Sequence, residues 1–314
     1  MEPNIKILES FTLADLPDLD VVVLGALELF QREVLPTINL EVYKRPLVVG
    51  SGNAEAMSRI IFQDFDAIFA SESNFEQKLK TNKAIDGVVI VSASGEKHAP
   101  IIAKVAKSYD KHLTLLTNSV NSSASLELDH LHEYDEYIFP KNREPYTYNT
   151  STYMGYILGY TKENPKEIYD FIKKNLPDEM FEKFAKYDKF FLIVPPKFLN
   201  IIRMLEIKFI ELFGRNVARD IATSEFVRHH VVEIAKSDEL FISFGCENKD
   251  WGNEGNRLEI PLPENADYGA MMAIGYYVIG QIQKRQKQYF KEGIIAYAEK
   301  MASVFNEKVS PIVE

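Results

Sequence analysis

Four short loops rich in serine, glycine and asparagine have the composition of a phosphate site. They lie at residues 50–53 (GSGN), 71–73 (SES), 92–97 (SASGEK) and 117–123 (TNSVNSS). A phosphate binds well where short hydroxyl side chains and backbone N–H groups meet at the start of a helix. Serine and asparagine also cap helices without binding any ligand. Four such loops at one edge of a sheet would favour the phosphate site over four separate caps.

The segments around these loops predict a parallel sheet that would bring them together. Short apolar runs of four to seven residues occur at residues 46–50, 66–70, 86–92, 112–118 and 135–140. Segments between them, such as AEAMSRIIFQDF, repeat apolar residues at the spacing of an amphipathic helix. Strands that alternate with helices in this rhythm form a parallel sheet with helices on both faces. Ligands of such sheets bind beyond the carboxyl ends of the strands, where all four loops would lie.

A second and shorter series of the same kind follows a polar, helical bridge at residues 161–189. Its apolar runs lie at residues 190–196, 239–245 and 257–263, and a long helix is expected from about residue 198 to 213. About a dozen residues separate the last two runs, which is too few for a full crossover helix. We therefore expect an abridged second lobe, followed by a helical tail from residue 268 to near residue 308.

The composition disfavours several functional classes. Lys and Arg number 36 and Asp and Glu 46, and the net charge of −10 disfavours binding to nucleic acid. The single cysteine, Cys246, cannot form an internal disulfide or a cysteine-based zinc site alone, and no acidic or histidine partners stand at metal-ligand spacing. We see no secretory signal, and the apolar runs are too short to cross a bilayer. We expect a soluble, cytoplasmic protein with no metal, no cofactor and no membrane partner.

A dinucleotide site is the first alternative to a phosphate site. The segment VVGSGNAEA has a G-x-G after a strand, with Glu72 about 20 residues further along the chain. Glu55 occupies the position of the third glycine, however, where its carboxylate would lie beside a pyrophosphate. A dinucleotide would also leave the serine-rich loops at residues 92–97 and 117–123 unexplained.

Five ordered motifs resemble the sugar isomerase (SIS) domain family. They are GSGNAEAMSR, ASESNFE, VSASGEK, TNSVNSSASLELD and REPYTYNTSTYMG, and they cover about residues 45–160. The chain is most similar to the isomerase lobe of glutamine–fructose-6-phosphate aminotransferase and to its deaminase and deglycase relatives. The resemblance implies an α/β protein of two SIS-type αβα lobes with parallel, flavodoxin-like sheets, the second lobe abridged, and with helices at both ends. The lobes would span residues 45–165 and 166–314, after a helical segment at residues 1–44.

The resemblance also implies which residues bind a sugar phosphate. The aligned positions are Ser51 in the first loop, Ser92, Ser94 and Lys97 in the third, and Ser122 and Ser123 in the fourth. Lys97 stands where the family has threonine. A lysine could still pair with a phosphate, as a flexible charge rather than as a hydroxyl donor.

The resemblance also implies catalytic residues, and these lie in the second lobe. Aldose–ketose isomerisation needs a base that moves a proton between C1 and C2 and a group that opens the sugar ring. The family's base aligns with Glu211 if one residue is inserted before Ala218. The ring-opening histidine then aligns with His229 or His230. An ungapped comparison with the phosphoglucose/phosphomannose isomerase branch instead places Arg215 at the base.

The resemblance implies two further site residues, and it leaves three possible functions. Glu144 aligns with the family's interface glutamate and would contact the substrate. Lys308 aligns with the family's C-terminal lysine, which faces the open-chain sugar, and both are candidate catalytic residues. The implied function is a phosphosugar isomerase, a homodimer that acts on a hexose or amino-hexose 6-phosphate through an enediol. A deaminase similar to glucosamine-6-phosphate deaminase is the first alternative. The second is a sugar-phosphate sensor without catalysis, which the abridged second lobe and Arg215 would fit.

Overall fold

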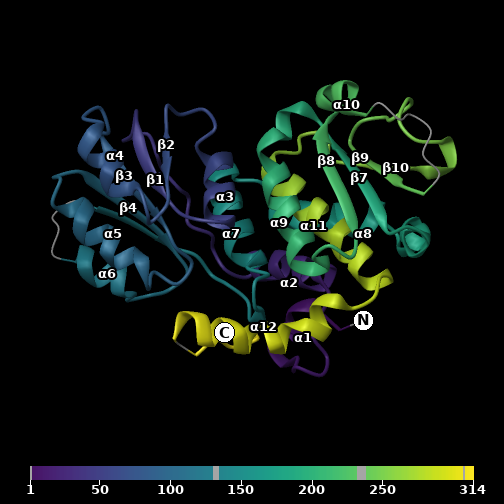
Figure 1. Cartoon of the computed structure of the whole chain (residues 1–314), viewed down its shortest axis with the longest axis horizontal. Coiled ribbons are helices and arrows are strands. Elements are labelled where there is room, and N and C mark those ends of the chain that lie inside the picture. The colour runs from purple at the N-terminus through teal and green to yellow at the C-terminus, as the bar shows by residue number, and fades with distance from the viewer. Residues whose placement is uncertain (1, 130–133, 232–237, 307) are drawn as a thin grey trace. The chain divides into compact units, whose positions relative to one another are not determined.

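The computed structural model describes residues 2–129, 134–231, 238–306 and 308–314. The chain divides into two compact units, one of residues 33–141 and 152–162 and the other of residues 1–32, 142–151 and 163–314. We call them the five-stranded unit and the four-stranded unit after their sheets (Figure 1). Neither unit is one continuous stretch of sequence, and the expected division at residues 44 and 165 stays a prediction.

The five-stranded unit is built on a parallel sheet with the strand order β2-β1-β3-β4-β5. The strands are β1 (Pro46–Val49), β2 (Ile68–Ala70), β3 (Gly87–Val91), β4 (His112–Thr117) and β5 (Tyr134–Ile138). The helices are α3 (Asn53–Ile61), α4 (Phe75–Thr81), α5 (His98–Lys107), α6 (Ser123–Leu128) and α7 (Thr150–Thr161), whose first two residues belong to the other unit. Each of the five apolar runs expected in the first lobe forms one of these strands.

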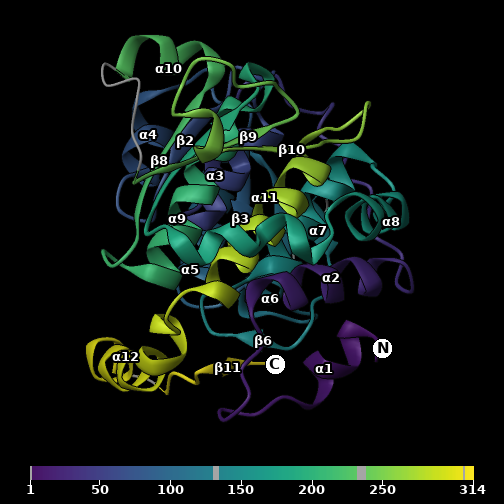
Figure 2. The ribbon, with the colours of Figure 1, turned by 90° about the vertical axis from the view of Figure 1, so that its right-hand side faces the viewer.

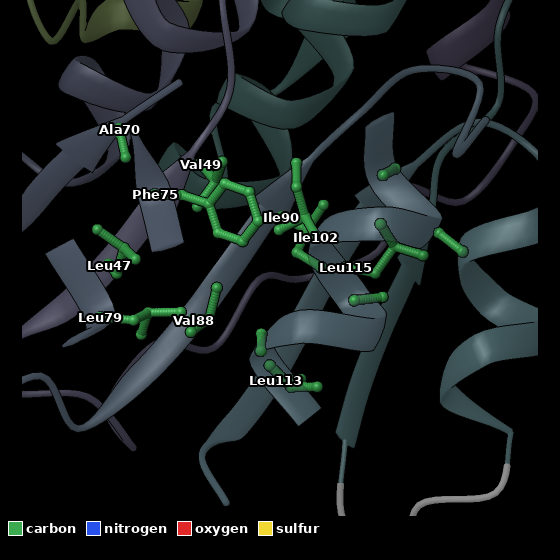
Figure 3. Close-up of a cluster of buried hydrophobic side chains, with 14 of the residues drawn as sticks. Leu47, Val49, Ala70, Phe75, Leu79, Val88, Ile90, Ile102, Leu113 and Leu115 are labelled. Carbon is green, nitrogen blue, oxygen red and sulfur yellow. The ribbon is translucent and has the colours of Figure 1, made fainter. Parts of the chain in front are cut away.

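One face of this sheet packs against α4, α5 and α6 (Figure 3). Alternate strand residues supply that face, namely Leu47, Val49, Val88, Ile90, Leu113 and Leu115. Phe75 and Leu79 of α4 and Ile102 of α5 cover them, and all are buried. Burial of such a side chain is worth about 1.5–3 kcal/mol, so this layer holds the three helices against the sheet.

The four-stranded unit has a second parallel sheet, with the order β10-β9-β7-β8. Its strands are β7 (Lys189–Val194), β8 (Ala218–Thr223), β9 (Leu240–Phe244) and β10 (Arg257–Ile260). In the described connection between β9 and β10 the helical element is the short 3₁₀ turn η3 (Glu254–Asn256), in line with the expected lack of a crossover helix. Two parallel sheets with flanking helices confirm the expected fold class.

Helices make up most of the rest of this unit. They are α1 (Asn4–Ser10), α2 (Leu19–Phe30), α8 (Pro165–Asn175), η1 (Asp178–Lys186), η2 (Pro196–Ile201), α9 (Ile202–Phe213), α10 (Ser224–His230), α11 (Tyr268–Arg285) and α12 (Tyr289–Phe305). Figure 2 shows β11 (Ile312–Val313) beside β6 (Glu144–Pro145), with which it pairs antiparallel. Across the described ranges, no helix has both the length and the apolar character needed to cross a membrane.

A close contact between α2 and α11 anchors the N-terminal helices to this unit. A Cβ atom at Gly280 would lie 2.1 Å from the backbone nitrogen of Asp20, so only glycine allows the two helices to approach this closely. Almost every residue of α11 is buried. The expected helical tail is therefore two helices, a buried α11 and a more exposed α12.

Candidate functional site

A pocket of about 200 Å³ opens at the carboxyl ends of β1 and β3 in the five-stranded unit. Ligands of parallel α/β sheets bind at this edge. Four of the six residues predicted to bind phosphate line it together, namely Ser51, Ser92, Ser94 and Lys97. The sheet thus brings the first and third loops to one place.

The third loop folds back on itself before α5 begins. The Oγ atom of Ser92 accepts a hydrogen bond from the Gly95 nitrogen at 3.1 Å, and Ser94 Oγ accepts one from the Glu96 nitrogen at 3.2 Å. Gly95 and Lys97 have positive φ angles of 66° and 57°. This path brings the N-terminus of α5 to the pocket, and the first N–H groups of an α-helix have no partner within the helix. An anion is favoured at such a position.

The fourth loop (residues 117–123) packs against the third loop (residues 92–97). A Cβ atom at Gly95 would lie 2.2 Å from Ser122 Oγ, so the contact requires glycine. The Ala124 nitrogen donates a hydrogen bond to Gly95 O at 2.9 Å, and the Asn118 nitrogen donates one to Ala93 O at 2.9 Å. The shape of the third loop therefore depends on the fourth.

Ser122 and Ser123 do not line this pocket. Ser122 is buried, and its Oγ caps α6 by accepting a hydrogen bond from the Ser125 nitrogen at 3.1 Å. The Ser123 nitrogen donates to Glu96 Oε1 at 2.9 Å. Both residues hold the fourth loop in shape, and their role as phosphate contacts stays a prediction.

The pocket carries charges of both signs. Lys97 and His98 line it together with Glu72 and Glu96. Hydrogen bonds from Ser123 hold the pKa of Glu96 below its usual value, so this carboxyl is ionised at neutral pH. A phosphate would therefore bind toward Lys97 and the start of α5, away from Glu96.

A second cavity, of about 330 Å³, lies in the four-stranded unit and includes the predicted base. It is lined by Thr147, Ile210, Glu211, Tyr289, Phe290, Gly293, Ile294 and Tyr297. Glu211 comes from α9, and the aromatic residues come from α12. The position of α12 beside Glu211 could not be predicted, because its residues lie about 80 positions further along the chain.

Lys208 holds Glu211 at the wall of this cavity. The lysine side chain is fully buried, and that of Glu211 is 18% exposed. Lys208 Nζ donates to Glu211 Oε2 at 2.6 Å, to Tyr148 O at 2.7 Å and to Thr147 O at 3.2 Å. These three acceptors use the three N–H donors of the ammonium group. Sequence reasoning missed Lys208, although its i,i+3 spacing from Glu211 is typical of a helical ion pair.

Glu144 shapes the turn that precedes α7. Its buried carboxylate accepts hydrogen bonds from the Thr150 nitrogen at 2.6 Å, the Ser151 nitrogen at 2.7 Å and the Ser151 hydroxyl. Burial raises the pKa of Glu144, while these hydrogen bonds and the charge of Lys208 oppose the shift. Glu144 lines neither cavity, so its predicted contact with substrate stays untested.

Neither His229 nor Lys308 lines either cavity. His229 is exposed on α10, and Lys308 is exposed between α12 and β11. The side chain of His230 lies outside the described part of the structure. Their catalytic roles stay predictions. Within the residues that the structure describes, no three His, Cys, Asp or Glu side chains are grouped as a metal ion would need.

No protein-family model matches this chain, and no curated protein matches its sequence. Solved structures match its fold. The C-terminal domain of glucosamine-fructose-6-phosphate aminotransferase from Francisella tularensis matches with a TM-score of 0.59 and 13% identity, over 92% of this chain and 95% of that one. Tagatose-6-phosphate ketose/aldose isomerase from Escherichia coli matches with 0.58 and 12%, over 86% and 88%. Glucosamine-6-phosphate deaminase from Thermotoga maritima matches with 0.55 and 12%, over 85% and 92%.

TM-scores of 0.55–0.59 show a shared fold, whereas identities of 12–13% leave the reaction open. The three matches agree with the family suggested by the five sequence motifs. This chain has the fold of the sugar isomerase (SIS) proteins.

Proposed function

We propose that this protein is a phosphosugar isomerase that interconverts an aldose and a ketose 6-phosphate of a hexose or amino-hexose. The pocket of the five-stranded unit carries this proposal. Three serine hydroxyls, a lysine and the N-terminus of a ten-residue helix meet there, at the edge of the sheet where ligands bind. The shared fold supports the same substrate class, because all three matched proteins are named for sugar 6-phosphates.

Each residue has a role that its chemistry explains. Ser51, Ser92 and Ser94 would donate hydroxyl hydrogen bonds to the phosphate, and Lys97 would add a positive charge. Glu211 would take the proton from one of C1 and C2 and return it to the other, through an enediol. The ammonium of Lys208, 2.6 Å from its carboxylate, stabilises Glu211 as the anion that a base must be.

A sugar-phosphate sensor is the second candidate, and the position of His229 favours it. This histidine is exposed on α10 and lines neither cavity. A sensor would use the phosphate pocket and would not exchange a proton of the sugar. A deaminase would use the same pocket and base, and it would release ammonia from an amino sugar.

Exchange of sugar protons with solvent deuterium tests the proposal. Fructose 6-phosphate, glucose 6-phosphate and glucosamine 6-phosphate would each be incubated with the protein in D₂O and followed by NMR. We expect deuterium at C1 or C2, and its loss in Glu211→Gln but not in Glu206→Gln, which changes a glutamate of the same helix outside the cavity.

Measurements of sugar-phosphate binding distinguish the proposed isomerase from a sensor. Ser94→Ala should weaken binding of the sugar phosphate, whereas Ser108→Ala, at the far end of α5, should not. Saturable binding that depends on Ser94, without any exchange, would favour the sensor. Ammonia release from glucosamine 6-phosphate would identify the deaminase. No binding of any of the three sugars would refute the proposal.

A further inference from the structure

The third loop and the start of α5 use several of their backbone N–H groups internally. The nitrogens of Gly95, Glu96 and Ala99 already donate hydrogen bonds to acceptors of the same loop. Pro100, the third residue of α5, has no N–H group to offer. A phosphate in this pocket therefore depends on side-chain donors more than it would at an ordinary helix start.

The side chains at the start of α5 have the charge that a helix N-terminus disfavours. The first turn of α5 contains no acidic residue, Lys97 is the N-cap residue, and His98 is the first residue of the helix. The helix dipole favours acidic side chains at this end and cations at the other. Lys97 also makes no side-chain capping hydrogen bond, so its position is not explained by capping. An anion bound in front of the helix would account for both residues.

His98 is a donor whose charge changes near neutral pH. It is exposed and lines the pocket together with Ser92, Ser94 and Lys97. A neutral imidazole has one N–H donor and a protonated imidazole has two. A phosphate dianion close to an imidazole favours the protonated form. A bound phosphate would therefore gain a positive charge and a second donor from the protonation of His98.

The other titratable side chains at this pocket explain such a proton uptake less well. Of the described residues they are Glu96 and Lys97 of the third loop, Glu72 of the loop after β2, Tyr153 of α7 and, next to the lining residue Ala54 on α3, Glu55. Lysine and tyrosine side chains already carry their protons at pH 7.5. Hydrogen bonds from Ser123 hold the pKa of Glu96 below its usual value, which opposes its protonation. Glu55 forms an ion pair with Arg59 at 2.7 Å. His98 and Glu72 are left, and a variant of each separates them.

We infer that His98 binds the phosphate of the substrate as a cation and takes up a proton when the phosphate binds. The inference rests on the proposed function, because it takes this pocket as the phosphate site. A sugar phosphate is mainly a dianion above pH 7. Its affinity should therefore fall as the pH rises from 7 to 8, because the proton that His98 needs becomes scarcer.

Titration calorimetry of the full chain with glucitol 6-phosphate tests this inference. This sugar alcohol has no carbonyl group, so no isomerisation contributes to the heat. Titrations at pH 7.5 in buffers of different ionisation enthalpy, such as Tris and HEPES, give the number of protons taken up. A free imidazole side chain is about one-tenth protonated at that pH, and a close dianion should bring it to between about half and almost full protonation. We expect about 0.4–0.9 protons per phosphate bound, and an affinity that falls about 2.5-fold to eightfold from pH 7 to 8.

His98→Gln removes the titratable group and keeps a side chain with an N–H donor. This variant should bind the probe with almost no proton uptake and with an affinity that hardly changes from pH 7 to 8. Glu72→Gln should keep the wild-type uptake, because its carboxylate is not the group that is protonated. His112→Gln is the matched control, because it makes the same change at the start of β4, at the opposite edge of the same sheet. It should also keep the wild-type uptake.

Two kinds of result would overturn the inference and leave the proposed function standing. The first is binding to the wild-type protein without proton uptake. The second is an uptake that persists in His98→Gln or disappears in Glu72→Gln. If the sugar alcohol does not bind, fructose 6-phosphate and the Glu211→Gln variant replace it in the same titrations. Failure of both ligands to bind would refute the proposed function, and the inference would fall with it.

Discussion

Replacement of Lys208 by methionine should lower the free energy of unfolding by about 3 kcal/mol. The ammonium group is fully buried and donates to Glu211 Oε2 at 2.6 Å, Tyr148 O at 2.7 Å and Thr147 O at 3.2 Å. Methionine keeps most of the apolar volume of the side chain and removes the charge. The variant therefore isolates the effect of the ammonium from that of packing.

The magnitude follows from three contributions. Removal of one partner of a buried ion pair typically costs about 3–5 kcal/mol, because the other charge is left without compensation. The Glu211 side chain is 18% exposed, so water replaces part of what it loses, and the expected value lies at the lower end of that range. The two backbone carbonyls lose their donor as well, which a buried acceptor does not regain from solvent.

Urea denaturation followed by Trp251 fluorescence would measure this change. Trp251 is the single tryptophan and belongs to the four-stranded unit, so its emission reports on the unit that contains Lys208. Lys300→Met, an exposed lysine of α12, is the control and should change stability by less than about 0.5 kcal/mol.

A double variant tests the assignment to Glu211. Adding Glu211→Gln to Lys208→Met removes the uncompensated carboxylate and should restore about 1–2 kcal/mol. A stability equal to that of the wild-type protein in Lys208→Met, at an unchanged urea dependence, would refute the reasoning.

Three further predictions concern helix contacts and the phosphate loop. Burial raises the pKa of Asp20 from 3.8 to about 6, so stability falls as pH rises from 3.8, where the unfolded chain ionises, and the loss is complete above about pH 6. Asp20→Asn should therefore stabilise the protein by up to about 3 kcal/mol at pH 8 and not at pH 3 in urea titrations. Glu163 accepts hydrogen bonds from three nitrogens at the start of α11, and Glu163→Ala should cost about 1–2 kcal/mol in the same assay. In Gly95→Ala the new Cβ atom would lie 2.2 Å from Ser122 Oγ, so this variant should bind fructose 6-phosphate at least tenfold more weakly in titration calorimetry. Gly52→Ala is the control, because Gly52 also has a positive φ angle but has open space around it, and it should weaken binding far less.

The sheets were predictable because strands buried on both faces must be continuously apolar. β3 and β9 are buried at every residue, and both stand out in the sequence as short apolar runs. β8 was missed for the opposite reason. It is an edge strand whose first four residues are exposed or half-buried, and its sequence ARDIAT has no continuous apolar run. Its pairing with β7 arises from tertiary structure, which a local pattern does not record.

Residue type alone does not tell whether a serine in these loops caps a helix or binds a phosphate. A serine at the start of a helix can cap the helix or bind a ligand, and both roles require the same hydroxyl at the same position. Burial separates the two: Ser94 lines the pocket, whereas Ser122 is buried and uses its Oγ to cap α6. The sequence therefore predicts the place of the site better than the identity of its contacts.

Lys208 shows why the surroundings of the predicted base required the structure. Its pairing with Glu211 follows from helical spacing, but its carbonyl acceptors at Thr147 and Tyr148 lie 61 and 60 residues away in the sequence. The same ammonium therefore orients the carboxylate of Glu211 and holds the turn at Thr147, whose φ angle of 76° is strained for a β-branched residue. Because one buried charge contacts both, a change at Thr147 should alter the position of Glu211. The strained turn and the predicted base thus form one structural unit, which neither local sequence segment could reveal alone.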